Sequence, residues 1–480
     1  MNGSPRLTLA GLSGGAGKTI VSLGLCRAWK KAGKRVRPFK KGPDYIDATW
    51  LGLAAGADAA NLDPFLLEPD IITGLYHDKM AGFDLAVIEG NRGLFDGKDV
   101  AGTCSTAELA RRLNSPVILV LDATKMTRTA AALVKGCATF EPGLNLAGVI
   151  LNRTAGDRHR RILRESIEQY TGIPVLGELP KMPKNPIPER HMGLISNREF
   201  AGQDIILDQL AAFVADWTDL DKLYAIAAGA PPLPCPAVGI WPQSTLGAPA
   251  PRIGFIRDAA LWFYYPENLE ALERAGAKLV ELSLLSGAKW PEIHGLYLGG
   301  GFPETQAQAL ADNVAVRAHV FGLSRAGMPI YAECGGFMYL CRELRIGTKS
   351  YPMAGIFPLA TSLCERPQGL GYSQALVVAA NPFHEVGTVI KGHEFHYSMC
   401  LAEPRNEDDA GSAPPLRFTL DMTRGSGMLG GKDGIIDGNT FAAYTHIHAL
   451  SAPQWAGRFA AAAAGFARSL NEAPARRDPD

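Results

Sequence analysis

A cysteine stands between an apolar run and a helical pattern, the position in which acyl-transfer enzymes carry a nucleophile. Cys334 follows the apolar residues 330–332 and precedes Gly335 and Gly336, and residues 337–341 resume at helical spacing. Paired glycines permit the strained turn of a nucleophile elbow. A thiol at such a turn faces a helix N-terminus, whose N–H groups and dipole favour the thiolate. We predict that Cys334 is a nucleophile rather than a small buried residue that ends a strand.

Cysteine acyl transfer also needs a base and donors for an oxyanion. The apolar residues 295–298 are followed by three glycines at 299–301, whose N–H groups can point at a developing oxyanion. The candidate bases are His446 and His448, which follow a predicted strand at 440–443. Alternation along a strand places both histidines on one face, so their spacing leaves the choice between them open.

A further cluster contains His393, Glu394 and His396. Its spacing is not the His-Glu-x-x-His pattern of a zinc helix, and no third ligand stands at a useful spacing. We interpret the cluster as a polar substrate wall or as structural histidines.

The N-terminal part of the chain carries a sequence suited to binding phosphate. Residues 11–19 are GLSGGAGKT, and they follow a predicted strand and open a predicted helix. The glycine N–H groups can surround phosphates, Lys18 supplies a cation, and Thr19 can hold Mg²⁺. The loop is one residue longer than the standard pattern. Ser13 stands where the partitioning P-loop ATPases carry a second lysine, which argues against a membrane- or DNA-positioning ATPase.

Acidic residues follow the predicted strands of this part. Glu89 ends the apolar residues 85–88, which is the geometry of an acid that organises Mg²⁺ beside a phosphate loop. Asp96 follows soon after, and the loop at 39–47 carries two lysines and two aspartates. Loops at the carboxyl ends of strands converge on the ligand crevice of an open α/β sheet. Glu89 is favoured as a ligand, whereas a solvated loop residue is an equal alternative for each aspartate.

Short apolar runs alternate with helical patterns such as those at 18–32 and 158–170, which indicates βαβ units and a mostly parallel sheet. Seven prolines at 230–251 interrupt this alternation, as in a linker. We predict an α/β fold with two doubly wound domains, at 1–228 and 252–470, with a linker at 229–251 and a tail at 471–480. The predicted strands include residues 7–10, 36–39, 85–88, 117–121, 147–151, 175–176, 252–256, 295–298 and 329–332.

Length and composition exclude several classes. A chain of 480 residues is too long for one ordinary core. Lys+Arg and Asp+Glu are both 48, so there is no basic excess to bind nucleic acid. No stretch reaches the roughly 18 uncharged apolar residues of a membrane span, and the N-terminus lacks a secretion signal. Eight scattered cysteines fit a reducing compartment, and we expect a cytoplasmic protein without membrane or nucleic-acid partners.

Ten motifs in order resemble those of the cobyrinic acid a,c-diamide synthase family over essentially the whole chain. The first half is also similar to dethiobiotin synthetase. The second half is similar to class I glutamine amidotransferases of the cobyric acid synthase type. The resemblance implies an ATP-binding amidoligase domain followed by a glutamine amidotransferase domain, and amidation of corrin-ring carboxylates in cobalamin biosynthesis. The motifs are GLSGGAGKT, FKKGPDYID, NLDPF, VIEGNRGLFDG, GVILNR, LYLGGGFPE, PIYAECGGFMYL, GLGYSQA, GHEFHYS and YTHIH.

In the thiol half, the resemblance implies that Cys334 is the glutaminase nucleophile and His446 its base. Gly300, Gly301 and Gly335 would form the oxyanion hole. The acid that usually completes a triad is lacking in this subfamily, and no His-x-Glu follows the histidine here.

In the phosphate half, the resemblance implies ATP and Mg²⁺ as cofactors and glutamine and a corrin as substrates. Under this resemblance, the chain is either a monomer or a homodimer. Asp47 and Asp96 would lie near the carboxylate that is activated, and Asn91, Arg92 and Tyr45 would contact the ring. The implied ATP ligands are Gly14, Gly15, Gly17, Lys18, Thr19, Lys40 and Asn152, with Asn152 reading the adenine, and the implied Mg²⁺ ligands are Thr19, Asp44 and Glu89.

Two segments depart from the family pattern. Residues 48–50 are Ala-Thr-Trp where the family continues with a proline and a histidine, and Asn91-Arg92 replaces Val-Met. The resemblance places both segments beside the tetrapyrrole, so hydrogenobyrinic acid and nickel sirohydrochlorin stay open as alternative substrates. A non-catalytic P-loop regulatory ATPase and a stand-alone cysteine hydrolase are the alternatives of another class.

Overall fold

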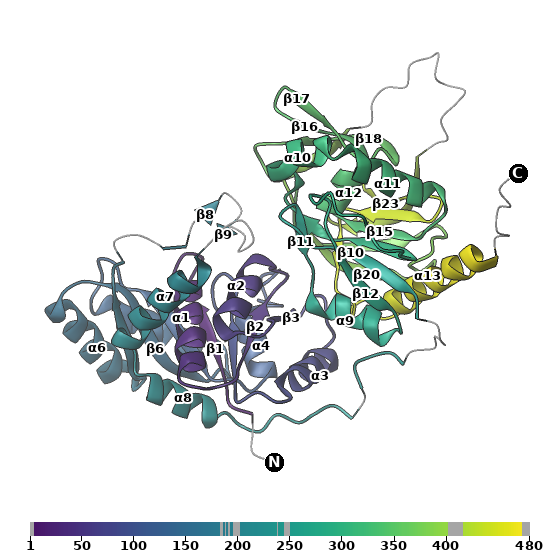
Figure 1. Cartoon of the computed structure of the whole chain (residues 1–480). Helices are drawn as coiled ribbons and strands as arrows, with labels where there is room; N and C mark the ends of the chain where they lie inside the picture. Colours follow the sequence, from purple (N-terminus) through teal and green to yellow (C-terminus); the bar gives the residue numbers. More distant parts are fainter. Residues whose placement is uncertain are drawn as a thin grey trace, which may run out of the picture. The chain divides into compact units, whose positions relative to one another are not determined.

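The chain forms two compact units, Met1–Ile240 and Trp241–Asp480, in a computed structural model (Figure 1). The boundary between the units falls inside the segment 229–251 that the prolines predict as a linker. Part of that linker, and residues 473–480 of the predicted tail, lie outside the described residues. The structure describes residues 4–182, 186–187, 189–190, 193–194, 202–237, 239–243, 250–401 and 416–472.

The first unit is built on a seven-stranded sheet in which every neighbouring pair is parallel. The strands that the sequence predicts in this part lie within it. In spatial order they are β3 (Ala60–Leu62), β2 (Val36–Lys41), β4 (Leu85–Glu89), β1 (Arg6–Gly11), β5 (Val117–Asp122), β6 (Leu146–Thr154) and β7 (Val175–Pro180). A separate two-stranded sheet joins β8 (Glu189–Arg190) and β9 (Gly193–Leu194).

Helices cover this sheet, which explains why its strands are continuous apolar runs. In β5, Leu119 packs in a core with α4, α5 and α6. Ile118 and Val120, which alternate with Leu119 along the strand, are also buried. The helices α1 and α7 lie side by side (Figure 1). The helices are α1 (Lys18–Lys31), α2 (Ile46–Ala55), α3 (Pro69–Met80), α4 (Thr106–Arg112), α5 (Thr129–Phe140), α6 (Asp157–Thr171), α7 (Gln203–Trp217) and α8 (Leu220–Ala228).

The second unit contains a ten-stranded mixed sheet, and its parallel part includes the predicted strands around the cysteine. The parallel part runs in the order β12 (Lys278–Leu282), β10 (Arg252–Ile256), β13 (Gly295–Leu298), β15 (Ile330–Glu333) and β24 (Thr440–Ala443). The antiparallel part continues with β23 (Lys432–Asp437), β22 (Arg417–Arg424), β19 (Gly369–Val377), β20 (Val389–His396) and β25 (His446–Ile447).

The antiparallel part must curl, because β24 and β25 are close in sequence but five strand spacings apart in the sheet order. Five spacings in a flat sheet would separate them by about 24 Å. Only Tyr444 and Thr445 connect the two strands, and three peptide steps reach about 11 Å at most. The curl brings β20 against β25, where His393 pairs directly with His446.

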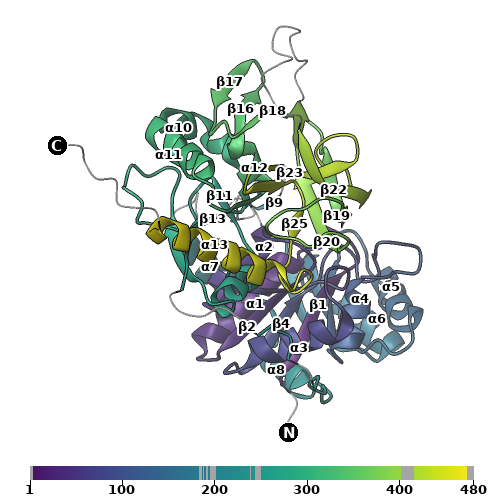
Figure 2. The ribbon, with the colours of Figure 1, turned by 90° about the vertical axis from the view of Figure 1, so that its right-hand side faces the viewer.

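The remaining elements of this unit surround the sheet. α13 packs against β13 and β10 (Figure 2, yellow). Within the described residues, no helix has both the length and the apolar content to cross a membrane. The helices are α9 (Pro266–Arg274), the 3₁₀ helix η1 (Pro303–Gln306), α10 (Ala307–Asp312), α11 (Val314–Arg325), α12 (Gly335–Leu340) and α13 (Trp455–Glu472). Two smaller sheets join β11 (Leu261–Phe263) with β14 (Gly300–Gly301), and β17 (Lys349–Pro352), β16 (Cys341–Ile346), β18 (Phe357–Leu363) and β21 (Ser398–Leu401).

The contact between α1 and α7 requires a glycine. A Cβ at Gly24 would lie 2.3 Å from Cγ2 of Val214 and 2.8 Å from the carbonyl oxygen of Leu210. We predict that Gly24→Ala destabilises the first unit by about 1–3 kcal/mol, measured by chemical unfolding, because the helices must move apart. Gly136→Ala in α5 is the control, since nothing lies within 4 Å of its Cβ and alanine favours the helix. Equal unfolding midpoints for the two variants would contradict this account.

Candidate functional sites

The phosphate loop of the first unit connects β1 to α1 and is tied to β6. Gly17 has a φ of +97°, and a Cβ there would lie 2.1 Å from Nδ2 of Asn152. That amide nitrogen donates to the carbonyl oxygen of Ala16 at 3.0 Å, and Oδ1 of Asn152 accepts the N–H of Arg153 at 2.9 Å. Asn152 therefore positions the loop, and its role in reading adenine stays a prediction. Gly14 and Gly15 lie in the same loop, with no atom within 4 Å of a Cβ placed at either.

The Lys18 ammonium lies over this loop. Its Nζ donates to the carbonyl oxygens of Ser13 at 3.0 Å and Arg92 at 2.7 Å. Burial lowers the pKa of Lys18 below its ordinary value, and the charge of Glu89 opposes the shift. The loop after β1 and the segment after β4 therefore meet at one cation.

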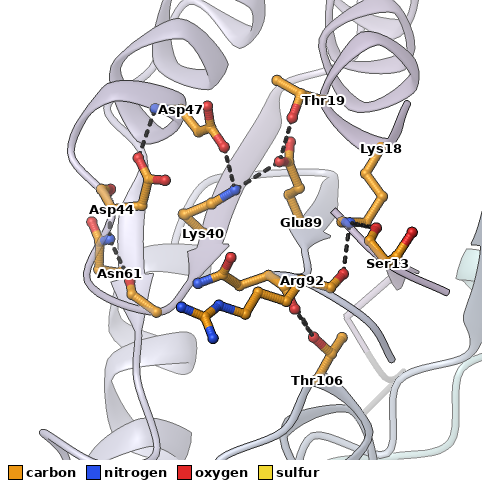
Figure 3. A network of polar contacts seen from close by, with 12 residues as sticks. Ser13, Lys18, Thr19, Lys40, Asp44, Asp47, Asn61, Glu89, Arg92 and Thr106 are labelled. Atoms are coloured by element: carbon orange, nitrogen blue, oxygen red, sulfur yellow. Dashed lines mark hydrogen bonds and ion pairs between the residues drawn. The ribbon is translucent and has the colours of Figure 1, made fainter. Parts of the chain in front are cut away.

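A buried network joins four polar side chains at the carboxyl ends of β2 and β4 (Figure 3). The Lys40 ammonium contacts Oδ2 of Asp47 at 2.6 Å and Oε1 of Glu89 at 2.7 Å. The Thr19 hydroxyl donates to the same Glu89 oxygen at 3.0 Å. Burial opposes the charge of Lys40, yet Asp47 and Glu89 together hold its pKa above the ordinary value. The structure thus brings together three predicted ATP or Mg²⁺ ligands and one predicted catalytic aspartate.

Asp44 acts on the local backbone in this structure. Its Oδ1 accepts the N–H of Asp47 at 2.9 Å, at the start of α2. Burial raises the pKa of Asp44 to about 7, and the charge of Asp47 adds to the shift. The amide of Asn61 donates to the carbonyl oxygens of Gly42 at 2.8 Å and Asp44 at 3.0 Å, and so holds the loop in place (Figure 3).

The Asn91-Arg92 segment lies against the loop after β2, which leads into the other departing segment at 48–50. A Cβ at Gly42 would lie 3.0 Å from Nδ2 of Asn91. Arg92 has a φ of +51° and is exposed, and its guanidinium extends away from Lys18 (Figure 3). Tyr45 is buried directly before α2, and Ala48 and Trp50 are buried within that helix. Their roles in ring binding stay predictions.

Asp96 is exposed near the same segment. Its Oδ2 accepts the N–H of Gly93 at 2.8 Å. Burial lowers the pKa of Lys18, and the charge of Asp96 is one of those that partly oppose this shift. A place near the reacting carboxylate stays a prediction for Asp96.

In the second unit, Cys334 occupies the turn between β15 and α12. Its φ of +46° is uncommon for a residue with a side chain, so the turn is strained as the glycine pair predicts. The side chain is buried, and the Cys334 N–H donates to the carbonyl oxygen of Ala443 at 2.7 Å. This hydrogen bond fixes the end of β15 against β24, the strand that precedes His446 and His448.

Burial and the helix N-terminus act on the Cys334 thiol in opposite directions. Burial raises the pKa of Cys334 above its ordinary value, and the charge of Glu304 adds to the shift. The Gly335 N–H lowers the pKa of Cys334, as expected, but desolvation of the thiol raises that pKa by more. The helix α12 that begins with this N–H has only six residues. Burial thus opposes ionisation of the thiol, and a neighbouring base would promote it.

The predicted oxyanion glycines lie close to one another. A Cβ at Gly335 would lie 3.0 Å from the backbone nitrogen of Gly301. A Cβ at Gly300 would lie 2.4 Å from Cε1 and 3.3 Å from Nε2 of His446. The Gly299 N–H instead donates to the Tyr264 hydroxyl at 2.8 Å. The structure thus leaves Gly300, Gly301 and Gly335 as the candidates, while their role stays a prediction.

The two histidines that the sequence could not separate have different surroundings. Nδ1 of His446 lies 3.3 Å from Oε2 of Glu333, and its other edge faces Gly300. Nε2 of His448 lies 3.6 Å from Oε2 of Glu267 instead. Both histidines are buried, but only the contacts of His446 join it to the strand of Cys334 and to the glycines. The geometry favours His446 as the base.

The cluster in β20 has separate partners for each side chain. His393 stacks on His446, with ring centroids 4.9 Å apart. Glu394 accepts the N–H groups of Ser426 and Gly427, each at 2.8 Å, and His396 stacks on Tyr444. Burial, and then the charge of His446, lower the pKa of His393 well below its ordinary value. Burial therefore disfavours a charged His393, which stacks directly on His446.

Both parts of the chain match known families. Residues 252–454 match the "CobB/CobQ-like glutamine amidotransferase domain", and residues 7–195 match the "CobQ/CobB/MinD/ParA nucleotide binding domain". A cobyrinate a,c-diamide synthase of Magnetococcus marinus is 41% identical over 94% of this chain and 96% of the relative. The chain belongs to the cobyrinate a,c-diamide synthase family. Relatives of the same name in Salmonella typhimurium and Syntrophotalea carbinolica are 38% and 40% identical, over 95% and 94% of this chain and 97% and 96% of their own lengths.

Membership of this family confirms the resemblance carried by the ten motifs, and the first unit holds a nucleotide-binding domain. Two acids beside the thiol were missed. Glu333 precedes Cys334 directly, and Glu304 lies in the motif that ends the glycine run. The only signal for Glu333 was a charged residue at the end of an otherwise apolar strand.

The residues around Glu89 fit a magnesium ion. Oε2 of Glu89 is buried and has no hydrogen-bond partner among the residues that the structure describes. Its other oxygen accepts the Thr19 hydroxyl, so a hydroxyl and a carboxylate, both hard oxygen ligands, stand together. In the described part of the chain, no group of three His, Cys, Asp or Glu residues is arranged to hold a metal ion. An ion at Glu89 would therefore take its other ligands from phosphate and water.

The Lys40 network makes a prediction about stability. Lys40→Met would leave the buried Glu89 without its cation, and removing one partner of a buried ion pair costs about 3–5 kcal/mol. We expect this loss in chemical unfolding of the first unit. Lys222→Met is the control, because its ion pair with Asp219 in the same unit is exposed and contributes little. An unfolding midpoint that Lys40→Met leaves unchanged would contradict a stabilising role of this network.

Proposed function

We propose that this protein amidates the a and c acetate carboxylates of cobyrinic acid, with ATP as the energy source and glutamine as the amide donor. The reaction belongs to cobalamin biosynthesis. One observation supports the proposal: the chain is similar over nearly its whole length to cobyrinate a,c-diamide synthases, with a nucleotide-binding domain matched at 7–195 and a glutamine amidotransferase domain at 252–454.

The second unit would release ammonia from glutamine. His446 takes the proton of the Cys334 thiol, and the sulfur attacks the side-chain amide carbon of glutamine. The N–H groups of Gly300, Gly301 and Gly335 would hold the oxyanion that forms. The carbon–nitrogen bond then breaks as His446 returns the proton to nitrogen, leaving ammonia and a thioester. Water hydrolyses the thioester to glutamate and frees the thiol.

The first unit would activate the ring carboxylate. A carboxylate oxygen attacks the γ-phosphorus of ATP, which gives an acyl phosphate and ADP. Ammonia then attacks the acyl carbon and expels phosphate, and the amide results. The loop N–H groups and Lys18 hold the phosphates and balance their charge. Thr19 and Glu89 would hold magnesium, which supplies further positive charge to the phosphates when bound.

Lys40 and Asp47 are suited to the activated carboxylate. The Lys40 charge is buried and kept by its two acidic neighbours, so it can balance negative charge as phosphate is transferred. Asp47 is partly exposed at the edge of this network, next to the loop that contacts Asn91. Arg92, exposed in the same region, would pair with another carboxylate of the ring.

Cys334→Ala tests the division of labour between the two units. Glutamine-dependent amidation should fall to background, because no other nucleophile can form the thioester. Amidation with ammonium chloride should stay within about twofold of the unmodified protein, measured as product per unit time. Loss of both activities would reject the two-site proposal. ATP turnover without any amide product would instead support the regulatory ATPase.

The substrate is tested by mass spectrometry of products formed from cobyrinic acid, hydrogenobyrinic acid and nickel sirohydrochlorin. We expect conversion of two carboxylates to amides on cobyrinic acid, with two ATP and two glutamine consumed per ring. Preferred conversion of either other tetrapyrrole would overturn the ring assignment and leave the amidation chemistry in place.

A further inference from the structure

The thiol site contains a third polar residue that the sequence pattern of glutaminases does not supply. We propose that Glu333 is a positioning residue that orients His446 and stabilises its protonated form while Cys334 reacts. It therefore takes the place of the acid that other amidotransferases carry after the histidine. The inference rests on the proposed glutaminase function of Cys334 and His446.

Register places this glutamate between the nucleophile and the base. Glu333 is the last residue of β15, and it pairs with Ala443 at the end of the neighbouring parallel strand β24. Cys334 follows Glu333 directly, and His446 follows Ala443 by three residues. The carboxylate therefore reaches the histidine from the strand before the nucleophile.

The contacts specify one tautomer of the base. Oε2 of Glu333 lies 3.3 Å from Nδ1 of His446, and Oε1 accepts the N–H of Ile447 at 3.4 Å. Both side chains are 1% exposed, so water does not compete for this contact. A carboxylate at Nδ1 keeps the proton on that nitrogen and leaves Nε2 free to accept the thiol proton. The edge of the ring that carries Nε2 faces Gly300 in the predicted oxyanion hole.

A purely structural role does not account for a carboxylate at this position. Tyr331 lies two residues earlier on the same face of β15 and packs in an apolar core, and an apolar residue would fill this site without the cost of burying a charge. Burial raises the pKa of Glu333, while His446 is the largest influence that lowers it. The Tyr297 hydroxyl adds a hydrogen bond. Among the groups around Glu333, the histidine that it would assist does the most to favour the ionised carboxylate.

The other charged groups near His446 cannot do the same work. Burial lowers the pKa of His393 well below its ordinary value, which disfavours its charged form. Both oxygens of Glu394 are engaged by the backbone N–H groups of Ser426 and Gly427. The titratable groups around the pair are Tyr264, Tyr297, Tyr331 and Cys334 near Glu333, and His393, Glu394 and His396 near His446.

Glu333→Gln tests the proposal, because the amide keeps the shape and removes the charge. The kcat of glutamine hydrolysis should fall by roughly 10²–10⁴-fold with the KM for glutamine nearly unchanged. Alkylation of Cys334 by iodoacetamide should require a pH about one unit higher, since His446 holds its proton less firmly without the carboxylate. Ammonia-dependent amidation should persist. Glu333→Asp should restore part of kcat.

Glu267→Gln is the matched control. Glu267 is equally buried in the same unit and lies next to His448, so its neutralisation reports the general cost of losing a buried carboxylate. We expect its kcat and its alkylation profile to match those of the unmodified protein. Wild-type kcat in Glu333→Gln, or equal losses in both variants, would overturn the proposal. If Glu333→Gln does not fold, wild-type kcat and alkylation profile in Glu333→Asp would overturn it.

The two variants distinguish failure of the Glu333 inference from failure of the proposed function. If Cys334→Ala retains glutamine-dependent turnover, the glutaminase assignment fails and this inference fails with it. If Cys334→Ala loses that turnover while Glu333→Gln keeps a wild-type kcat, only the role of Glu333 fails.

Discussion

Parallel strands end at the same edge of a sheet, and the residues of both candidate sites lie in segments that follow the ends of such strands. In the first unit the phosphate loop, the loop after β2 and the segment after β4 meet at Lys18 and Lys40. In the second unit the segments after β13, β15 and β24 bring together the glycines, Cys334 and His446. Residues far apart in sequence therefore become neighbours because the strands that carry them pair in parallel.

Buried charge constrains each site as strongly as the sheet does. Glu89 is held by Lys40 and Thr19, and Glu333 is held by His446, the Ile447 N–H and Tyr297. A buried carboxylate without such partners would be costly, so the groups proposed to perform the chemistry also fix one another's positions. The same desolvation makes the Cys334 thiol harder to ionise, so the proposed mechanism depends on His446 to take its proton.

The antiparallel half of the second unit serves the site by closing around it. The short connection from β24 to β25 forces the strands between them to curl, and β20 then lies against the base. His393 and His396 are thereby buried against His446 and Tyr444 rather than exposed as ligands. The stacking of His396 on Tyr444 favours the structural interpretation of that residue, while a place in the substrate wall stays a prediction for His393.

The phosphate loop, the strained cysteine turn and most strands of both parallel parts were readable from sequence, because each depends on neighbouring residues and on local periodicity. The antiparallel strands and the choice between His446 and His448 were not, and neither was the contact of Glu333 with a histidine 113 residues away. Local pattern predicted the nucleophile and the phosphate loop. Strand register and burial decided which acid meets which base, because pairing between distant strands depends on the packing of the whole sheet rather than on any short segment.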